Sequence, residues 1–155
     1  MLITQSEIDD AVATLAPVMR RTPLVASRVL SERSGSDVWL KCENLQRTGS
    51  FKPRGAFYRI SRLSSAERAA GVVAASAGNH AQGVAWSAAH LGITSRVYMP
   101  VGAALPKLAA TKAYGAEVVL TGETIDQSLV AAREFAENTG ATPVSYTHLT
   151  LPTKA

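Results

Sequence analysis

The amino-acid sequence predicts an α/β fold in which a parallel sheet lies between two layers of helices. Short apolar stretches typical of buried strands alternate with stretches of about a dozen residues whose apolar positions recur at helical spacing. A glycine ends three of the helical stretches, at Gly92, Gly115 and Gly140, where a left-handed backbone is common. The predicted strands span 72–75, 96–99 and 117–120, and the predicted helices span 53–63, 79–91, 106–114 and 124–138.

The amino-terminal region predicts a helix followed by extended chain. Ser6 can cap the helix, with Asp9 three residues later, and Pro17 closes it. Residues 22–24 predict extended chain, and the apolar stretch 38–42 predicts a further strand. Because strands joined by helices lie parallel, we expect ligands at the carboxyl ends of the strands that follow this region.

The composition is that of an ordinary globular domain. Apolar residues make up 46% and charged residues 18% of the 155 residues, which is enough apolar material for a core. The net charge is +4, but the basic residues are scattered apart from the pair Arg20 and Arg21. No basic run alternates with aromatic residues, so the sequence does not favour a nucleic-acid partner.

The sequence also bears on the compartment. The single cysteine, Cys42, excludes an internal disulfide and a cysteine-based metal site. The first residues lack the basic start and apolar stretch of a signal peptide. The apolar run at 72–75 is far too short to cross a bilayer. We therefore expect a soluble, cytoplasmic protein without a membrane partner.

The first candidate for chemistry is Lys52, within the segment 48–56. Pro53 suits the first turn of a helix, so Lys52 lies at a helix amino terminus. The positive end of the helix dipole opposes a second positive charge there, which suits a lysine that attacks a carbonyl as a neutral amine. Gly49 and Gly55 allow close approach of a flat ligand. The alternative is a solvated surface lysine.

The second candidate is the turn 76–80, which follows a predicted strand and opens a helix. Backbone N–H groups at such a turn can bind a carboxylate, and Asn79 can both cap the helix and face a ligand. The alternative is an ordinary turn with an asparagine cap. For the His80 side chain, a packed or hydrogen-bonded role is favoured over acid–base work. The glycine patterns of dinucleotide and P-loop sites are absent, and no set of residues forms a metal site.

The segments 41–56 and 74–85, in this order and spacing, resemble the fold-type II enzymes that depend on pyridoxal 5'-phosphate (PLP). Within these, the sequence is most similar to the threonine dehydratase (threonine ammonia-lyase) and serine racemase group. The resemblance extends from Thr22 to Val118 and implies a tryptophan synthase beta-like, three-layer αβα fold. It also implies a lyase of amino-acid metabolism, such as isoleucine biosynthesis, whose full-length parent forms a homo-oligomer.

The resemblance assigns roles to individual residues. Lys52 would carry PLP as a Schiff base and act as the base for the α-proton, Phe51 would pack against the cofactor ring, and Asn79 would contact its hydroxyl. The reaction implied is the dehydration and deamination of L-threonine, and of L-serine, to 2-oxobutanoate or pyruvate and ammonia. The implied contacts to the substrate carboxylate come from Ser76, Ala77, Gly78, Asn79 and His80.

Ala77 bears on the alternatives within the family. Serine racemases of this fold carry a hydroxyl residue there as a second base, so alanine favours elimination over racemisation. A serine racemase, another β-eliminating PLP enzyme and a non-catalytic module that binds PLP or another small molecule remain as alternatives.

The segment 144–155 departs from the pattern. Residues 144–153 match the translation of a transposon adapter used to build sequencing libraries, so we interpret 144–155 as a non-native read-through tail and assign no role to His148. The alternative is a genuine final strand. Residues 1–49 would then belong to the larger PLP domain and 50–143 to a smaller α/β domain. The family's phosphate-binding loop and pyridine-nitrogen partner would lie beyond residue 155, so we expect poor PLP binding and negligible activity from this chain alone.

Overall fold

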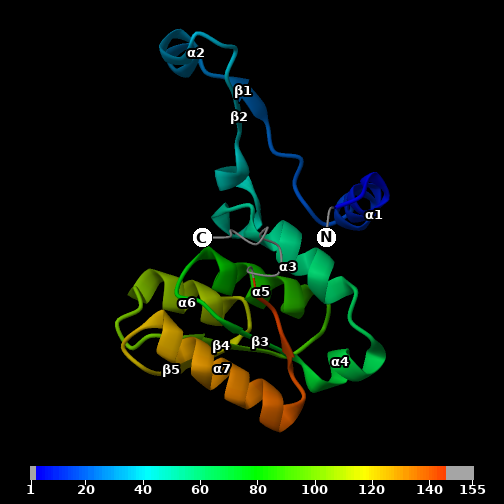
Figure 1. The fold of residues 1–155 in the computed structure, drawn as a ribbon, viewed down its shortest axis with the longest axis vertical. Coiled ribbons are helices and arrows are strands. Elements are labelled where there is room, and N and C mark those ends of the chain that lie inside the picture. Colours follow the sequence, from blue (N-terminus) through cyan, green and yellow to red (C-terminus); the bar gives the residue numbers. More distant parts are fainter. Residues whose placement is uncertain (1–2, 146–155) are drawn as a thin grey trace. The chain divides into compact units, whose positions relative to one another are not determined.

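The computed structural model describes residues 3–145. The chain divides into two compact units, residues 1–51 and 52–155, which are taken in turn. Figure 1 follows the helices and strands of both units along the chain. Within the described range, no helix is both long enough and apolar enough to span a bilayer.

The first unit is built around a small antiparallel sheet. Its two strands pair with Ala26 opposite Trp39, and a short helix that the sequence did not predict connects them. Ser27 caps that helix, which ends at Gly35 with a left-handed backbone (φ 70°). The elements are α1 (Gln5–Leu15), β1 (Leu24–Ala26), α2 (Arg28–Ser34), β2 (Trp39–Lys41) and the 3-10 helices η1 (Glu43–Leu45) and η2 (Arg47–Gly49).

The predicted cap of α1 was wrong by two residues. Thr4 is the N-cap: its side chain accepts a hydrogen bond from the Glu7 N–H, and the Glu7 carboxylate accepts from the Thr4 N–H at 2.8 Å. This reciprocal capping box uses a glutamate, whereas the aspartate three residues after Ser6 has a shorter side chain than the box requires. Ser6 therefore lies inside the first turn of the helix.

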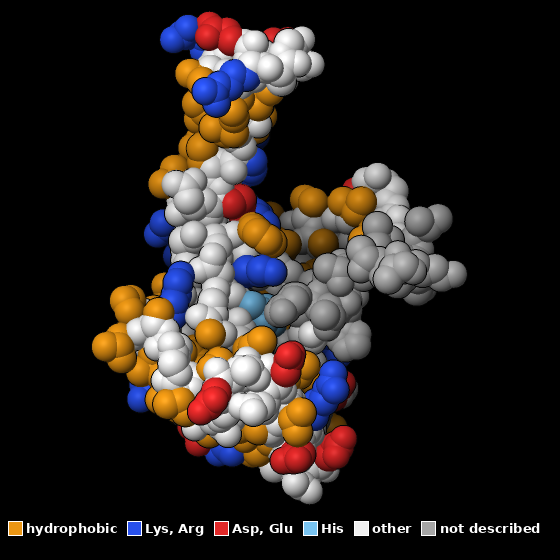
Figure 2. Space-filling view, turned by 60° about the vertical axis from the view of Figure 1, so that its left-hand side comes forward, with side chains coloured by type: hydrophobic (Ala, Val, Ile, Leu, Met, Phe, Trp, Pro, Cys, Tyr) orange, Lys and Arg blue, Asp and Glu red, His pale blue; other side chains and the backbone are white. Residues whose placement is uncertain are grey.

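Gln46 links two segments of the first unit that are distant in sequence. Its side chain is 3% exposed; Oε1 accepts from the Arg20 N–H at 3.0 Å, and Nε2 donates to the Arg20 carbonyl at 2.8 Å. By contrast, the residues of β1 and β2 are exposed, and Figure 2 shows hydrophobic side chains gathered on this part of the unit. Buried polar pairing thus contributes to holding this unit together.

The second unit contains a four-stranded parallel sheet in the order β5-β4-β3-β6. Two of the strands have the predicted bounds, the third begins one residue earlier than predicted, and β6 was not predicted. Because this sheet is parallel throughout, the carboxyl ends of its strands meet at one edge. The strands are β3 (Val72–Ala75), β4 (Ser95–Met99), β5 (Glu117–Leu120) and β6 (Thr142–Pro143).

Five helices accompany this sheet. Four of them match the predicted helices to within two residues at each end. The fifth, α4, was not predicted; Ser64 and Glu67 form a capping box at its start, and Gly71 ends it. The helices are α3 (Lys52–Ser61), α4 (Ser65–Ala70), α5 (Asn79–His90), α6 (Leu105–Ala113) and α7 (Ile125–Thr139).

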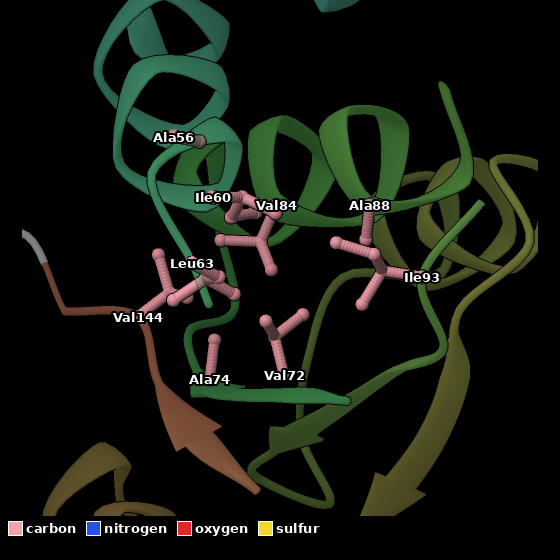
Figure 3. Packing of buried hydrophobic residues seen from close by; sticks show 9 residues of the cluster. All are labelled: Ala56, Ile60, Leu63, Val72, Ala74, Val84, Ala88, Ile93 and Val144. Atoms are coloured by element: carbon pink, nitrogen blue, oxygen red, sulfur yellow. The ribbon is translucent and has the colours of Figure 1, made fainter. Parts of the chain in front are cut away.

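Alternate side chains of β3 show how the helices cover the sheet. Val72 and Ala74 pack with residues of α3 and α5, including Val84, in the cluster of Figure 3. Val73 lies in a second cluster with Ala132 of α7. Because successive side chains of a strand point to opposite faces, α5 and α7 lie on opposite faces of the sheet, as Figure 1 also shows. The three-layer αβα class predicted from the sequence is confirmed.

The chain continues the parallel pairing beyond β6. Val144 is 4% exposed, belongs to the cluster of Figure 3, and donates its N–H to the Val73 carbonyl at 2.8 Å. Residues 146–155 of the expected tail, His148 included, lie outside the described residues. The interpretation of 144–155 as read-through stays a prediction.

Candidate functional site

The turn after β3 lies at the carboxyl edge of the parallel sheet. Ser76 extends the ladder by donating its N–H to the Tyr98 carbonyl at 3.0 Å, and its Oγ accepts from the Gly78 N–H at 3.2 Å. Gly78 is the N-cap of α5, and no side chain caps the helix. The predicted asparagine cap was therefore wrong: Asn79 is the first residue of α5. The Asn79 side chain does not cap the helix and instead accepts a hydrogen bond from Lys107.

Lys52 is the first residue of α3 and is half-buried. The start of α3 packs closely against the middle of α5. A Cβ added at Gly83 would lie 3.1 Å from the Lys52 carbonyl carbon and 3.2 Å from the Lys52 Cβ and the Pro53 nitrogen. The glycine therefore permits an approach of two helices that any other residue would obstruct. This contact brings the Lys52 backbone and the helix that begins with the 76–80 turn together within one unit.

His80 is buried behind this turn, with 7% of its surface exposed. Its Nε2–H donates to the Val144 carbonyl at 2.8 Å, so the ring links α5 to the chain that follows β6. Burial lowers the pKa of His80, the positive charge of Lys52 lowers it further, and the hydrogen bond to Val144 opposes both effects. The ring is thus packed and hydrogen-bonded, as the sequence favoured, and Nε2 is the donor because a carbonyl oxygen only accepts.

Sequence reasoning missed Lys107. This residue lies in the first turn of α6, and its Nζ donates to Asn79 Oδ1 at 2.7 Å. The contact joins the chain after β4 to the chain after β3 at the carboxyl edge. A signal was present in the sequence, because a lysine in the first turn of a helix lies against the helix dipole.

The helices that open around the site differ in the charge of their first turns from α4 and α7, the other two helices of the second unit. The first turns of α3, α5 and α6 contain no acidic residue. In contrast, Glu7, Glu67 and Asp126 occupy the first turns of α1, α4 and α7. Acids at helix starts neutralise the positive end of the dipole, so their absence around the site leaves a positive potential suited to an anionic ligand.

The remaining site residues predicted from the sequence are placed as follows. Ala77 and Gly78 are half-buried in the turn, and a Cβ added at Gly78 would meet nothing within 4 Å. Phe51 is the last residue of the first unit and 59% exposed. Among the residues that the structure describes, no group of three histidine, cysteine or acidic side chains could hold a metal ion.

Comparison with known proteins identifies the class to which this fold and lysine-bearing site belong. Residues 15–149 match the family model described as "Pyridoxal-phosphate dependent enzyme". The chain belongs to this family.

Two curated relatives are similar to most of the chain. An L-threonine ammonia-lyase of Thermotoga maritima is 51% identical over 140 residues, which is 90% of this chain and 35% of that protein. A catabolic L-threonine dehydratase of Staphylococcus aureus is 44% identical over 144 residues, which is 92% of this chain and 42% of that protein. The chain therefore spans well under half the length of these relatives.

Solved structures show the same fold. Maize serine racemase superposes with a TM-score of 0.83 at 33% identity, over 89% of this chain and 42% of that one. The processed form of a threonine deaminase from Solanum lycopersicum superposes with a TM-score of 0.81 at 35% identity, over 92% and 41% of the two chains. Both a deaminase and a racemase thus share this architecture.

The side chains of this region have the chemistry that PLP, the cofactor of this family, would need. Lys52 would offer a primary amine to the cofactor aldehyde, and Asn79 would offer an amide to an oxygen of the ring. The turn at Gly78 is open, because an added Cβ would meet nothing there. The amine, the amide and the open turn all belong to the second unit.

Proposed function

We propose that this chain carries the lysine-bearing part of a PLP-dependent L-threonine ammonia-lyase that also accepts L-serine. Threonine would lose water to give an enamine. Hydrolysis of the enamine would give 2-oxobutanoate and ammonia, and serine would give pyruvate and ammonia in the same way. The proposal draws its substrate from the two curated relatives, at 51% and 44% identity.

The single observation that carries the proposal is the close approach at Gly83. The Lys52 Cβ lies 3.2 Å from the position that a Cβ of residue 83 would occupy, so α5 and the start of α3 are in direct contact. This contact supports the proposal, because it packs the helix that begins with Lys52 against the helix that begins within the 76–80 turn. An amino acid bound through its nitrogen and its carboxylate would require an amine and a carboxylate-binding turn that are held close together.

In this mechanism, Lys52 Nζ would hold the cofactor covalently and would be the base that accepts the proton from the α-carbon. The turn 76–80 would hold the substrate carboxylate, Asn79 would bind the ring oxygen, and Phe51, the chain neighbour of Lys52, would pack against the ring. When bound, PLP supplies the electron sink that makes the α-proton acidic. His80 would position the turn through its bond to Val144 rather than exchange a proton.

A second candidate is amino-acid racemisation, because serine racemases are among the structural relatives. Racemisation by two bases needs a proton donor on each face of the substrate. Ala77, in the turn itself, has no proton to donate, which favours elimination. We further propose that the protein is cytoplasmic, forms a homo-oligomer and has a role in amino-acid metabolism such as isoleucine biosynthesis. Residues 1–155 alone should have negligible turnover, because the chain spans only 35–42% of its curated relatives.

The test is to trap the cofactor. The chain is incubated with PLP and reduced with borohydride, which converts an imine to a stable secondary amine, and the modified peptide is identified by mass spectrometry. We expect modification at Lys52 that is lost in Lys52→Ala and retained in Lys112→Ala, an exposed lysine of the same unit. Modification spread over surface lysines would refute the assignment. Ketoacid release from threonine by the full-length protein then separates an enzyme from a PLP-binding module.

A further inference from the structure

The bond between Lys107 and Asn79 determines which atoms Asn79 can offer to a ligand. An ammonium group has three donors and no acceptor. At 2.7 Å from Lys107 Nζ, the Asn79 side chain must therefore present its oxygen to the lysine. Its NH2 group, on the opposite side of the amide, then points away from Lys107. A lone asparagine could present either end of its amide, so the lysine removes this ambiguity.

The position of Lys107 is electrostatically unfavourable on its own. It lies in the first turn of α6 and contacts the first residue of α5, so its charge meets the positive ends of two helix dipoles. The other lysine of α6, Lys112, lies in the last turn, where a cation is favourable. A lysine retained at the unfavourable end of a helix is expected to serve a local purpose.

We propose that Lys107 is a positioning residue: it holds Asn79 Oδ1 so that the Asn79 amide is a hydrogen-bond donor toward the ligand bound at the carboxyl edge of the sheet. The ligand atom concerned is an oxygen acceptor, and its identity as the ring oxygen of PLP rests on the proposed function. The ammonium acts through Asn79 and does not touch the reacting atoms.

The first measurement needs no cofactor. The side-chain amide resonances of Asn79 are recorded by NMR in the 155-residue chain and assigned by their loss in Asn79→Ala. Lys107→Met should shift them and Lys107→Arg, which keeps a donor-only cation, should restore them. Lys112→Met is the matched control: it removes the same charge from an exposed position of the same helix and should leave the resonances unchanged. Unchanged Asn79 resonances in Lys107→Met would overturn the proposal.

The second measurement is the dissociation constant of PLP, titrated by absorbance in a double-mutant cycle. Loss of a charge-assisted hydrogen bond at this exposed pair should raise the constant about three- to tenfold in Lys107→Met. In the Asn79→Ala background, Lys107→Met should have no further effect, because the lysine acts through the asparagine. An equal loss in both backgrounds would mean direct attraction of the ligand by the charge and would overturn the positioning role. If the unmodified chain binds no PLP, the proposed function fails for this chain, and the Asn79 resonances still decide the role of Lys107.

Discussion

Gly83→Ala is the sharpest test of the packing that holds the candidate site together. The added Cβ would lie 3.1–3.2 Å from three atoms, of which the Lys52 carbonyl carbon and the Pro53 nitrogen are backbone atoms. Backbone atoms at the start of a helix cannot rotate away as a flexible side chain can. The substitution should therefore push α5 and α3 apart by a few tenths of an ångström, which displaces the Lys52 backbone.

Two opposing effects set the expected change in stability. Replacing glycine by alanine in a helix interior stabilises the helix by about 1 kcal/mol. Inserting a methyl group into a closely packed contact costs about 1–3 kcal/mol. The net expectation is a loss of about 1 kcal/mol in the free energy of unfolding, which lowers Tm by about 2–4 °C for a chain of this size.

Thermal unfolding followed by circular dichroism measures this effect, and the yield of PLP trapped at Lys52 measures the effect on the site. Gly102→Ala is the control, because a Cβ at Gly102 would meet nothing within 4 Å. We expect a lower Tm and a lower trapping yield for Gly83→Ala, with little change in the control. A rise in Tm with an unchanged yield would refute the reasoning, because the helix propensity alone would then explain the result.

Two further predictions concern stability. Because burial lowers the pKa of His80 below its ordinary value of 6.5, folding stability should be fully present above pH 6.5 and should fall as the pH drops through the folded pKa. Thermal melts of the unmodified chain from about pH 8 to about pH 5 should show this fall in Tm. The fall should be smaller in His80→Gln and unchanged in the control His90→Gln, whose histidine is exposed. The same pH dependence of Tm in the unmodified chain and both variants would contradict the prediction. Gln46→Ala should destabilise the first unit by about 1–3 kcal/mol, because two backbone groups of Arg20 lose their partner. Hydrogen exchange at the Arg20 amide should be faster in Gln46→Ala than in the unmodified chain, and unchanged in the control Gln5→Ala, which replaces an exposed glutamine. An unchanged exchange rate in Gln46→Ala would refute the prediction.

The predicted elements differ in how completely local sequence determines them. The strands at 72–75 and 117–120 have the predicted bounds, because each is a short run with two consecutive valines, bounded by glycine-containing turns. The helices α2 and α4 were missed, because they have only 7 and 6 residues and lack an apolar periodicity long enough to detect. Their signals are caps, at Ser27 and Ser64.

For the candidate site too, local sequence determines some features and leaves others to the fold. Lys52 and the turn 76–80 stand out in the sequence, because a lysine before a proline and a small polar turn after a strand are local patterns. The capping role assigned to Asn79 was wrong, because cap position depends on the backbone of Gly78, which no propensity specifies.

The sequence by itself determined the α/β class, the main helices and strands of the second unit, and the family to which the chain belongs. Only the tertiary structure decided that Gly83 is the contact point of α5 with the Lys52 backbone and that Lys107 binds Asn79 from 28 residues away. Periodicity and motifs report on neighbours along the chain, whereas these contacts depend on the distances between helices packed on one sheet. Lys52 is thus visible in the sequence, but the residues that position its surroundings are visible only in the fold.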